Sequence, residues 1–173
     1  MKFLVFMPPK GFRDETVSAI RLLFSKWDIE CAMSSYTSKE CVGKHGATYR
    51  PDLNTSSASP ENYDGIVLAD GPGIEDYKLY EFRPLLDLLV GFNTQKKYII
   101  GIDNAIKIIS RANIVRDRKV SAPKEEEAKK AVQLFRGVLS KESVESSDNL
   151  ITVGSSDNIE EKLDKVVSYL GVR

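Results

Sequence analysis

The sequence predicts an α/β protein with a mostly parallel sheet covered by helices on both faces. Short apolar runs, typical of fully buried strands, alternate with stretches in which apolar residues recur at three- and four-residue steps, typical of amphipathic helices. No internal repeat and no break in composition divides the 173 residues. We therefore expect a single domain spanning residues 1–173, large enough to bury a core without a metal or a disulfide.

The first part of the chain predicts two strands around a helix. Residues 3–7 form an apolar run that ends at two prolines, which indicates the first strand. A helix is predicted to follow, because several apolar side chains recur on one of its faces, namely Val17, Ile20, Leu23, Phe24 and Trp27. Asp14 is the predicted N-cap of this helix, since Asp is a preferred residue there. Residues 29–33 alternate apolar and polar side chains, which favours a second strand. Residues 43–53 are predicted to be an irregular or hairpin excursion, and residues 55–62 a surface loop.

The rest of the chain continues the alternation. Residues 65–69 form a buried run that ends at Asp70-Gly71-Pro72-Gly73, a glycine-rich turn at which the backbone can approach a ligand closely. The remaining elements are predicted as a helix at 84–92, a strand at 98–102, helices at 105–112 and 123–135, a strand at 150–153, and a terminal helix from Ile159. Asp157 and Glu160 have capping-box spacing at the start of that helix.

Asp103 ends the apolar run of residues 98–102, just before helical spacing resumes. Ligands of open α/β sheets bind beyond the carboxyl ends of the strands, so an aspartate in this place indicates a functional site. Asp is also a preferred N-cap residue, and capping of the next helix is the alternative interpretation.

Charge and hydropathy exclude several classes of function. Lys plus Arg and Asp plus Glu both number 25, so no net field favours nucleic acid or an acidic membrane surface. No apolar run has the length needed to span a bilayer, and the N-terminal run is too short for a signal peptide. We therefore expect a soluble, cytoplasmic protein without nucleic-acid or membrane partners. In that compartment Cys31 and Cys41 are expected to be reduced thiols.

Short motifs recur in a characteristic order along almost the whole chain. They are Asp14-Glu15-Thr16, Val42-Gly43-Lys44-His45-Gly46 followed by Pro51-Asp52, Tyr63-Asp64-Gly65-Ile66-Val67-Leu68 leading to Asp70-Gly71, Ile99-Ile100-Gly101-Ile102, Val120-Ser121-Ala122-Pro123 and Leu150-Ile151-Thr152. Together they resemble the ThiJ/PfpI family, within the class I glutamine-amidotransferase-like superfamily. The resemblance implies a flavodoxin-like three-layer α/β/α sandwich, a nucleophile elbow after residue 102, and a homo-oligomer, commonly a dimer.

The resemblance also implies a site, from which this chain departs at the decisive position. The family has a cysteine on the elbow, a glutamate after the first strand, and backbone N–H groups of a Gly-Gly turn and the elbow that stabilise an oxyanion. Here Asp103 stands in place of the cysteine, Asn104 where a histidine often follows, and Asp70-Gly71 in place of Gly-Gly. Glu15 is retained, whereas the only histidine, His45, matches no catalytic position and is not expected to have a role.

Amidase or peptidase chemistry of the cysteine type is therefore not expected. The resemblance places Glu15 and Asp103 face to face within hydrogen-bonding reach, where two carboxylates would share a proton or recruit a cation. Asp70 would be a third carboxylate if a hard divalent ion were bound, but oxygen-ligand sites usually need more donors. We expect no cofactor and no resident metal.

Three functional classes remain open. The first is a non-catalytic binding or regulatory protein that takes a small molecule in a pocket formed by Glu15, Asp103, Asp70, Gly71 and Asn104. In a sharper form of this hypothesis, Asp103 permanently mimics a cysteine oxidised to sulfinate. The second is a carboxylate-based hydrolase or lyase with Asp103 as nucleophile or base. The third is a structural protein with a vestigial site.

Overall fold

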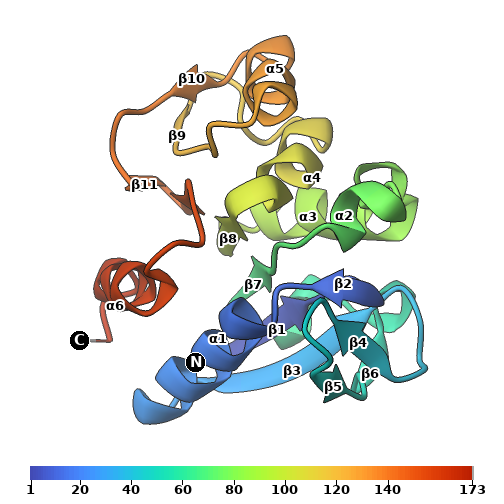
Figure 1. Ribbon diagram of the computed structural model, residues 1–173. Coiled ribbons are helices and arrows are strands. Elements are labelled where there is room, and N and C mark those ends of the chain that lie inside the picture. Colours follow the sequence, from blue (N-terminus) through green and yellow to red (C-terminus); the bar gives the residue numbers. More distant parts are fainter. Residues whose placement is uncertain (173) are drawn as a thin grey trace.

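A seven-stranded sheet forms the centre of the computed structural model, which describes residues 1–172 (Figure 1). The strand order is β11-β12-β8-β7-β1-β3-β6, and all neighbours are parallel except β11 and β12. In that order the strands are Val144–Ser147, Leu150–Val153, Tyr98–Ile102, Gly65–Leu68, Lys2–Phe6, Glu30–Ser35 and Leu53–Asn54. The central part, β3-β1-β7-β8-β12, has the strand order of flavodoxin, which confirms the expected fold class.

Helices cover both faces of the sheet, as the apolar runs predicted. Along β1, Phe3 and Val5 face one core and Leu4 and Phe6 face the other, and all four side chains are buried. The first core is covered by α1 (Asp14–Lys26) and α6 (Ile159–Tyr169). The second is covered by α3 (Arg83–Thr94), α4 (Ile106–Arg111) and α5 (Glu126–Leu134), with the short α2 (Gly73–Asp76) beside them (Figure 1). Strands buried on both faces cannot carry polar alternation, and this is why they are continuous apolar runs.

Two small sheets lie outside the central one. One joins β2 (Lys10–Phe12), β4 (Cys41–Gly43) and β5 (Thr48–Tyr49), and the antiparallel pairing of β4 with β5 confirms the predicted hairpin excursion. The other pairs β9 (Lys119–Val120) with β10 (Val138–Leu139), which no sequence pattern indicated. Cys31 and Cys41 are free cysteines.

The predicted loop at residues 55–62 is more ordered than expected. It contains two 3-10 turns, η1 (Thr55–Ser57) and η2 (Pro60–Asn62), and a further turn, η3 (Leu79–Glu81), precedes α3. Thr55 is buried rather than exposed, and its hydroxyl donates to the Ser35 carbonyl at 2.8 Å. The loop is therefore attached to the end of β3.

Two predicted helix caps are wrong. The N-cap of α1 is Arg13, and the Asp14 carboxylate instead accepts the backbone N–H groups of His45 and Ala47, both at 2.8 Å. The N-cap of α6 is Asn158, in the left-handed region with a φ of 53° and with no side-chain capping bond, so Asp157 and Glu160 form no capping box.

In the described part of the chain, residues 1–172, we find no helix with both the length and the apolar character to cross a bilayer.

Candidate functional site

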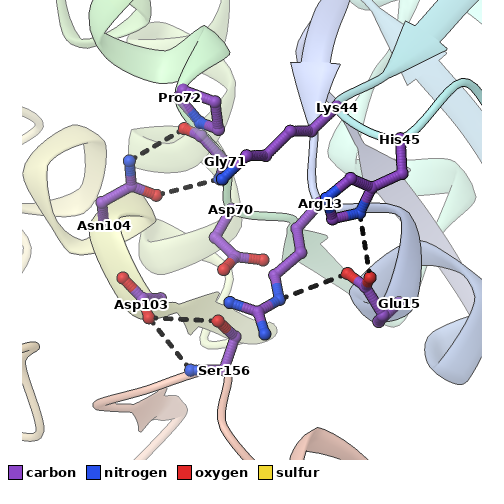
Figure 2. Close-up of a pocket in the computed structure, with 10 residues that line it drawn as sticks. All are labelled: Arg13, Glu15, Lys44, His45, Asp70, Gly71, Pro72, Asp103, Asn104 and Ser156. Carbon is purple, nitrogen blue, oxygen red and sulfur yellow. Dashed lines mark hydrogen bonds and ion pairs between the residues drawn. The ribbon is translucent and has the colours of Figure 1, made fainter.

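The carboxyl ends of the parallel strands surround a cavity of about 280 Å³ (Figure 2). Its position follows from the topology, because β1 lies between β3 and β7, so that the connections after β1 and β7 run in opposite directions and leave a crevice. The lining residues are Arg13, Glu15, Lys44, His45, Asp70, Gly71, Pro72, Asp103, Asn104 and Ser156. All five site residues predicted from the sequence line this cavity.

Asp103 adopts a strained backbone conformation at the junction of β8 and the next helical turn. Its φ is 52°, in the left-handed region that side chains other than glycine rarely adopt. Its Oδ2 accepts two hydrogen bonds from Ser156, from the backbone N–H at 2.9 Å and from the hydroxyl at 3.2 Å. The 3-10 turn Asp103–Ala105 has Ile102 as its N-cap and no side-chain capping bond, so the capping interpretation of Asp103 is wrong. Asp103 instead ties the end of β8 to the segment after β12.

Asn104 and Gly71 are joined by a pair of hydrogen bonds. The Gly71 N–H donates to Oδ1 of Asn104 at 3.1 Å, and Nδ2 of Asn104 donates to the Gly71 carbonyl at 2.8 Å. Gly71 has a φ of 137°, and a Cβ added there would lie 2.2 Å from the carbonyl oxygen of Gly11. Only glycine therefore fits this turn, and both polar groups of its backbone are occupied by one side chain.

Glu15 does not face Asp103 as expected. Its Oε2 lies 3.4 Å from Nε of Arg13, and its Oε1 lies 3.1 Å from Nδ1 of His45. In Figure 2 the Arg13 guanidinium lies between the carboxylates of Glu15 and Asp103. The Glu15 backbone N–H, together with His45 and the charge of Arg13, holds the pKa of Glu15 below its ordinary value, so this side chain is an anion at neutral pH.

His45 is one of several pocket residues that were not predicted from the sequence, with Arg13, Lys44 and Ser156. The turn between β4 and β5 carries both His45 and Lys44 to the rim, and it is fixed there by the bonds from its backbone to Asp14. His45 and Glu15 are 30 residues apart, and no local spacing connects them. The motif at residues 42–46 is the sequence signal that could have identified His45, because it lies in the excursion that reaches the site.

Asp70, rather than Glu15, is the carboxyl group whose pKa is raised by burial and by the charge of Asp103. Its side chain is 3% exposed, and its Oδ1 has no hydrogen-bond partner among residues 1–172. Burial, with a further contribution from the charge of Asp103, raises the pKa of Asp70 to about 6, although the hydroxyls of Thr16 and Ser156 oppose the shift. Asp70 is therefore a buried acceptor that gains or loses a proton near neutral pH.

The acidic residues of the pocket do not form a metal site. Within the described residues, 1–172, no three side chains of His, Cys, Asp or Glu are grouped as ligands of one ion would be. Each of Glu15 and Asp103 is engaged with protein donors instead. The pocket is lined mainly by charged and polar side chains of both signs.

Comparisons with known proteins agree with the fold and the motifs. The model of the DJ-1/PfpI family matches residues 1–168. An uncharacterized protein of Methanocaldococcus jannaschii is 30% identical over 162 residues, which are 90% of this chain and 76% of the relative. The crystal structure of a ThiJ/PfpI domain protein from Brachyspira murdochii superposes with a TM-score of 0.91 at 22% identity, covering 99% of this chain and 97% of that one. The crystal structure of Drosophila melanogaster DJ-1beta superposes with a TM-score of 0.83 at 16% identity, covering 99% of this chain and 91% of that one.

Proposed function

Because this chain belongs to the DJ-1/PfpI family, we propose that it is a binding or regulatory member that keeps the pocket but not the cysteine chemistry. Asp103 takes the place of the nucleophile on the elbow, and its φ of 52° is the sharp strand-to-helix turn that such an elbow needs. A carboxylate is a weaker nucleophile than a thiolate. No histidine adjoins Asp103, since His45 is bonded to Glu15 on the other side of Arg13 in Figure 2.

The double hydrogen bond between Asn104 and Gly71 is the observation that carries this proposal. Stabilising an oxyanion requires backbone N–H groups that point at the reacting oxygen and are free to donate to it. The Gly71 N–H donates to Asn104 Oδ1 at 3.1 Å, so this donor is already occupied. Both the nucleophile and one oxyanion donor of cysteine-type chemistry are therefore missing.

Asp103 is bonded as a permanent anion would be. Its Oδ2 accepts both the N–H and the hydroxyl of Ser156. A cysteine sulfinate at the same position would present similar charge and acceptor oxygens, so the loop after β12 would adopt one arrangement around Asp103 without any oxidation step. This gives the regulatory form of the proposal, in which the pocket is held permanently in the state that an oxidised cysteine would produce.

Restoring the cysteine at residue 103 and then freeing the Gly71 N–H tests the proposal. We expect the parent protein to show no turnover of glyoxals, amides or small esters. Asp103→Cys alone should also be nearly inactive, because Asn104 still occupies the Gly71 N–H. The double variant Asp103→Cys with Asn104→Ala frees that donor and is expected to be the more active of the two. Turnover by the parent that disappears in Asp103→Asn would contradict the proposal.

A carboxylate-based hydrolase or lyase is the second candidate, and one observation favours it. Asp70 and Asp103 line the same cavity, and the pKa of Asp70 is raised to about 6. A buried carboxyl group whose pKa is raised toward neutral pH is suited to act as a general acid or base. This candidate predicts a pH–rate profile with a limb near the pKa of Asp70 that is absent in Asp70→Asn.

The assembly state of the chain is also a proposal. The family resemblance suggests a homodimer, and light scattering of the purified protein would test it. A monomer at micromolar concentration would contradict it.

A further inference from the structure

The floor of the pocket contains an acceptor that the protein leaves unsatisfied. Asp70 is 3% exposed, yet no group among residues 1–172 donates to its Oδ1. An unpaired buried carboxylate is costly, and it is stabilised most by a cationic group that brings several N–H donors. Asp103 lies on the same floor and adds a second negative charge. The floor is therefore complementary to a positively charged donor.

The rim of the pocket has the opposite character. Lys44 is exposed, and among the described residues none forms an ion pair with its ammonium group. In Figure 2 its side chain extends from the β4–β5 turn toward the turn at Gly71. Arg13, by contrast, is already paired with Glu15. Lys44 is thus the cation that remains available to an anionic group on a ligand.

We propose that the pocket binds a small zwitterion, with its ammonium group on the carboxyl groups of Asp70 and Asp103 and its carboxylate on Lys44. This inference rests on the binding function proposed above and adds a ligand class to it. A primary ammonium has three donors on one compact centre, which suits two neighbouring carboxyl groups. The volume of about 280 Å³ is that of a metabolite-sized site, large enough for an amino acid.

Binding of an ammonium group is coupled to ionisation of Asp70. The charged groups around Asp70 are Asp103 after β8, Arg13 and Glu15 at the start of α1, and Lys44 with His45 in the β4–β5 turn. Since the pKa of Asp70 is about 6, protons compete with the ligand below that pH. The affinity should therefore fall as the pH is lowered, by up to about tenfold for each pH unit below 6.

A matched series of ligands tests the class directly by calorimetry and ligand-observed NMR. The zwitterions are glycine, β-alanine and γ-aminobutyrate, which differ in the distance between their charges. Propylamine and butyrate are the controls, since each is γ-aminobutyrate without one charged group. At about pH 8, where Asp70 is ionised, we expect at least one zwitterion to bind about tenfold more tightly than either control.

Variants locate the binding groups. Asp70→Asn keeps the shape of the side chain but removes its charge, and it should weaken zwitterion binding about tenfold or more. Lys44→Met should weaken binding about threefold, because its contact is exposed, and should leave propylamine binding unchanged. Asp76→Asn removes an exposed carboxylate outside the pocket and should have no effect.

The outcomes separate this inference from the function on which it rests. Equal binding of butyrate and γ-aminobutyrate, unchanged binding in Asp70→Asn, or no zwitterion binding at millimolar concentration each overturns the ligand class. If a neutral small molecule binds in the pocket and the Asp70→Asn variant binds it equally well, the ligand class is overturned too. The proposed binding function would still stand. Turnover that depends on Asp103 would instead refute the proposed function itself.

Discussion

Replacing Asp70 with asparagine is expected to stabilise the protein at neutral pH and to have little effect in acid. Asp70 is 3% exposed, its carboxyl group is affected by the charge of Asp103, and its Oδ1 has no donor among residues 1–172. Ionising it in the folded state is therefore unfavourable. Asparagine has nearly the same shape and carries no charge, so the variant removes this penalty without creating a cavity.

The magnitude follows from the pKa of Asp70. Its value of about 6 in the folded protein lies roughly two pH units above the ordinary value of 3.8. Each pH unit corresponds to about 1.4 kcal/mol, so the ionised side chain lowers the free energy of unfolding by about 3 kcal/mol. Asparagine still has to bury an amide at this position, and we expect a net gain of about 1–3 kcal/mol above pH 6.

The raised pKa of Asp70 makes the parent protein less stable as the pH rises from acid toward neutrality. At a pH below 3.8, Asp70 is protonated in both the folded and the unfolded state and contributes nothing. Between 3.8 and about 6 the folded state keeps a proton that the unfolded state has released, so stability falls as the pH rises. Above about 6 both states are ionised and the penalty is constant. The parent and the variant should therefore diverge across this interval and then run parallel.

Urea denaturation of both proteins at several pH values between about 3.5 and 8 measures this difference. Carboxylates with lowered pKa values, such as Asp14 and Glu15, lose their stabilising effect in acid in both proteins and cancel in the comparison. Asp76→Asn is the matched control, because its carboxylate is exposed, and it should change the free energy of unfolding by less than about 0.5 kcal/mol. A difference between parent and Asp70→Asn that is independent of pH, or a variant less stable than the parent at about pH 8, would refute the reasoning.

Three further predictions concern the turns that form the pocket. Gly71→Ala should lower the free energy of unfolding by about 3 kcal/mol or more in thermal denaturation, because its Cβ would lie 2.2 Å from the Gly11 carbonyl oxygen; a change below about 1 kcal/mol would contradict this. Asn104→Leu should cost about 2 kcal/mol in urea denaturation, since both its hydrogen bonds to Gly71 are lost, and an unchanged midpoint would count against the double bond. Ser156→Ala should lower the free energy of unfolding by about 1 kcal/mol in the same assay, because it loses the bond from the hydroxyl to Asp103. Asp103→Ala should lower it further, because it loses both bonds from Ser156. The reverse order would show that these bonds do not fix Asp103.

The sheet was predictable because its signals are local. A strand buried on both faces is mostly apolar, so β1 from Phe3 onward, β7 and β8 appear in the sequence as apolar runs, and β12 departs from this only at the buried Thr152. Parallel strands place their carboxyl ends on one edge of the sheet, so the sequence alone assigns the polar residues after those runs to a common site. Glu15, Asp70, Gly71, Asp103 and Asn104 all line one cavity for that reason.

The pairing of side chains within the pocket was less predictable. The family resemblance predicts Glu15 opposite Asp103 and no role for His45, whereas the structure joins Glu15 to His45 and Asp103 to Ser156. These partners lie 30 and 53 residues apart. No spacing rule links residues over such distances, because their contact depends on how the loops after different strands close over the sheet.

The sequence by itself thus determined the α/β fold, the edge of the sheet at which a site would form, and the absence of a cysteine at residue 103. Tertiary structure decided which polar groups satisfy one another there: Asn104 bonds to the Gly71 backbone, Ser156 bonds to Asp103, and Oδ1 of Asp70 is left buried without a donor. The physical reason is that apolar periodicity is a property of neighbouring residues. Hydrogen-bond satisfaction and burial are properties of the whole folded chain.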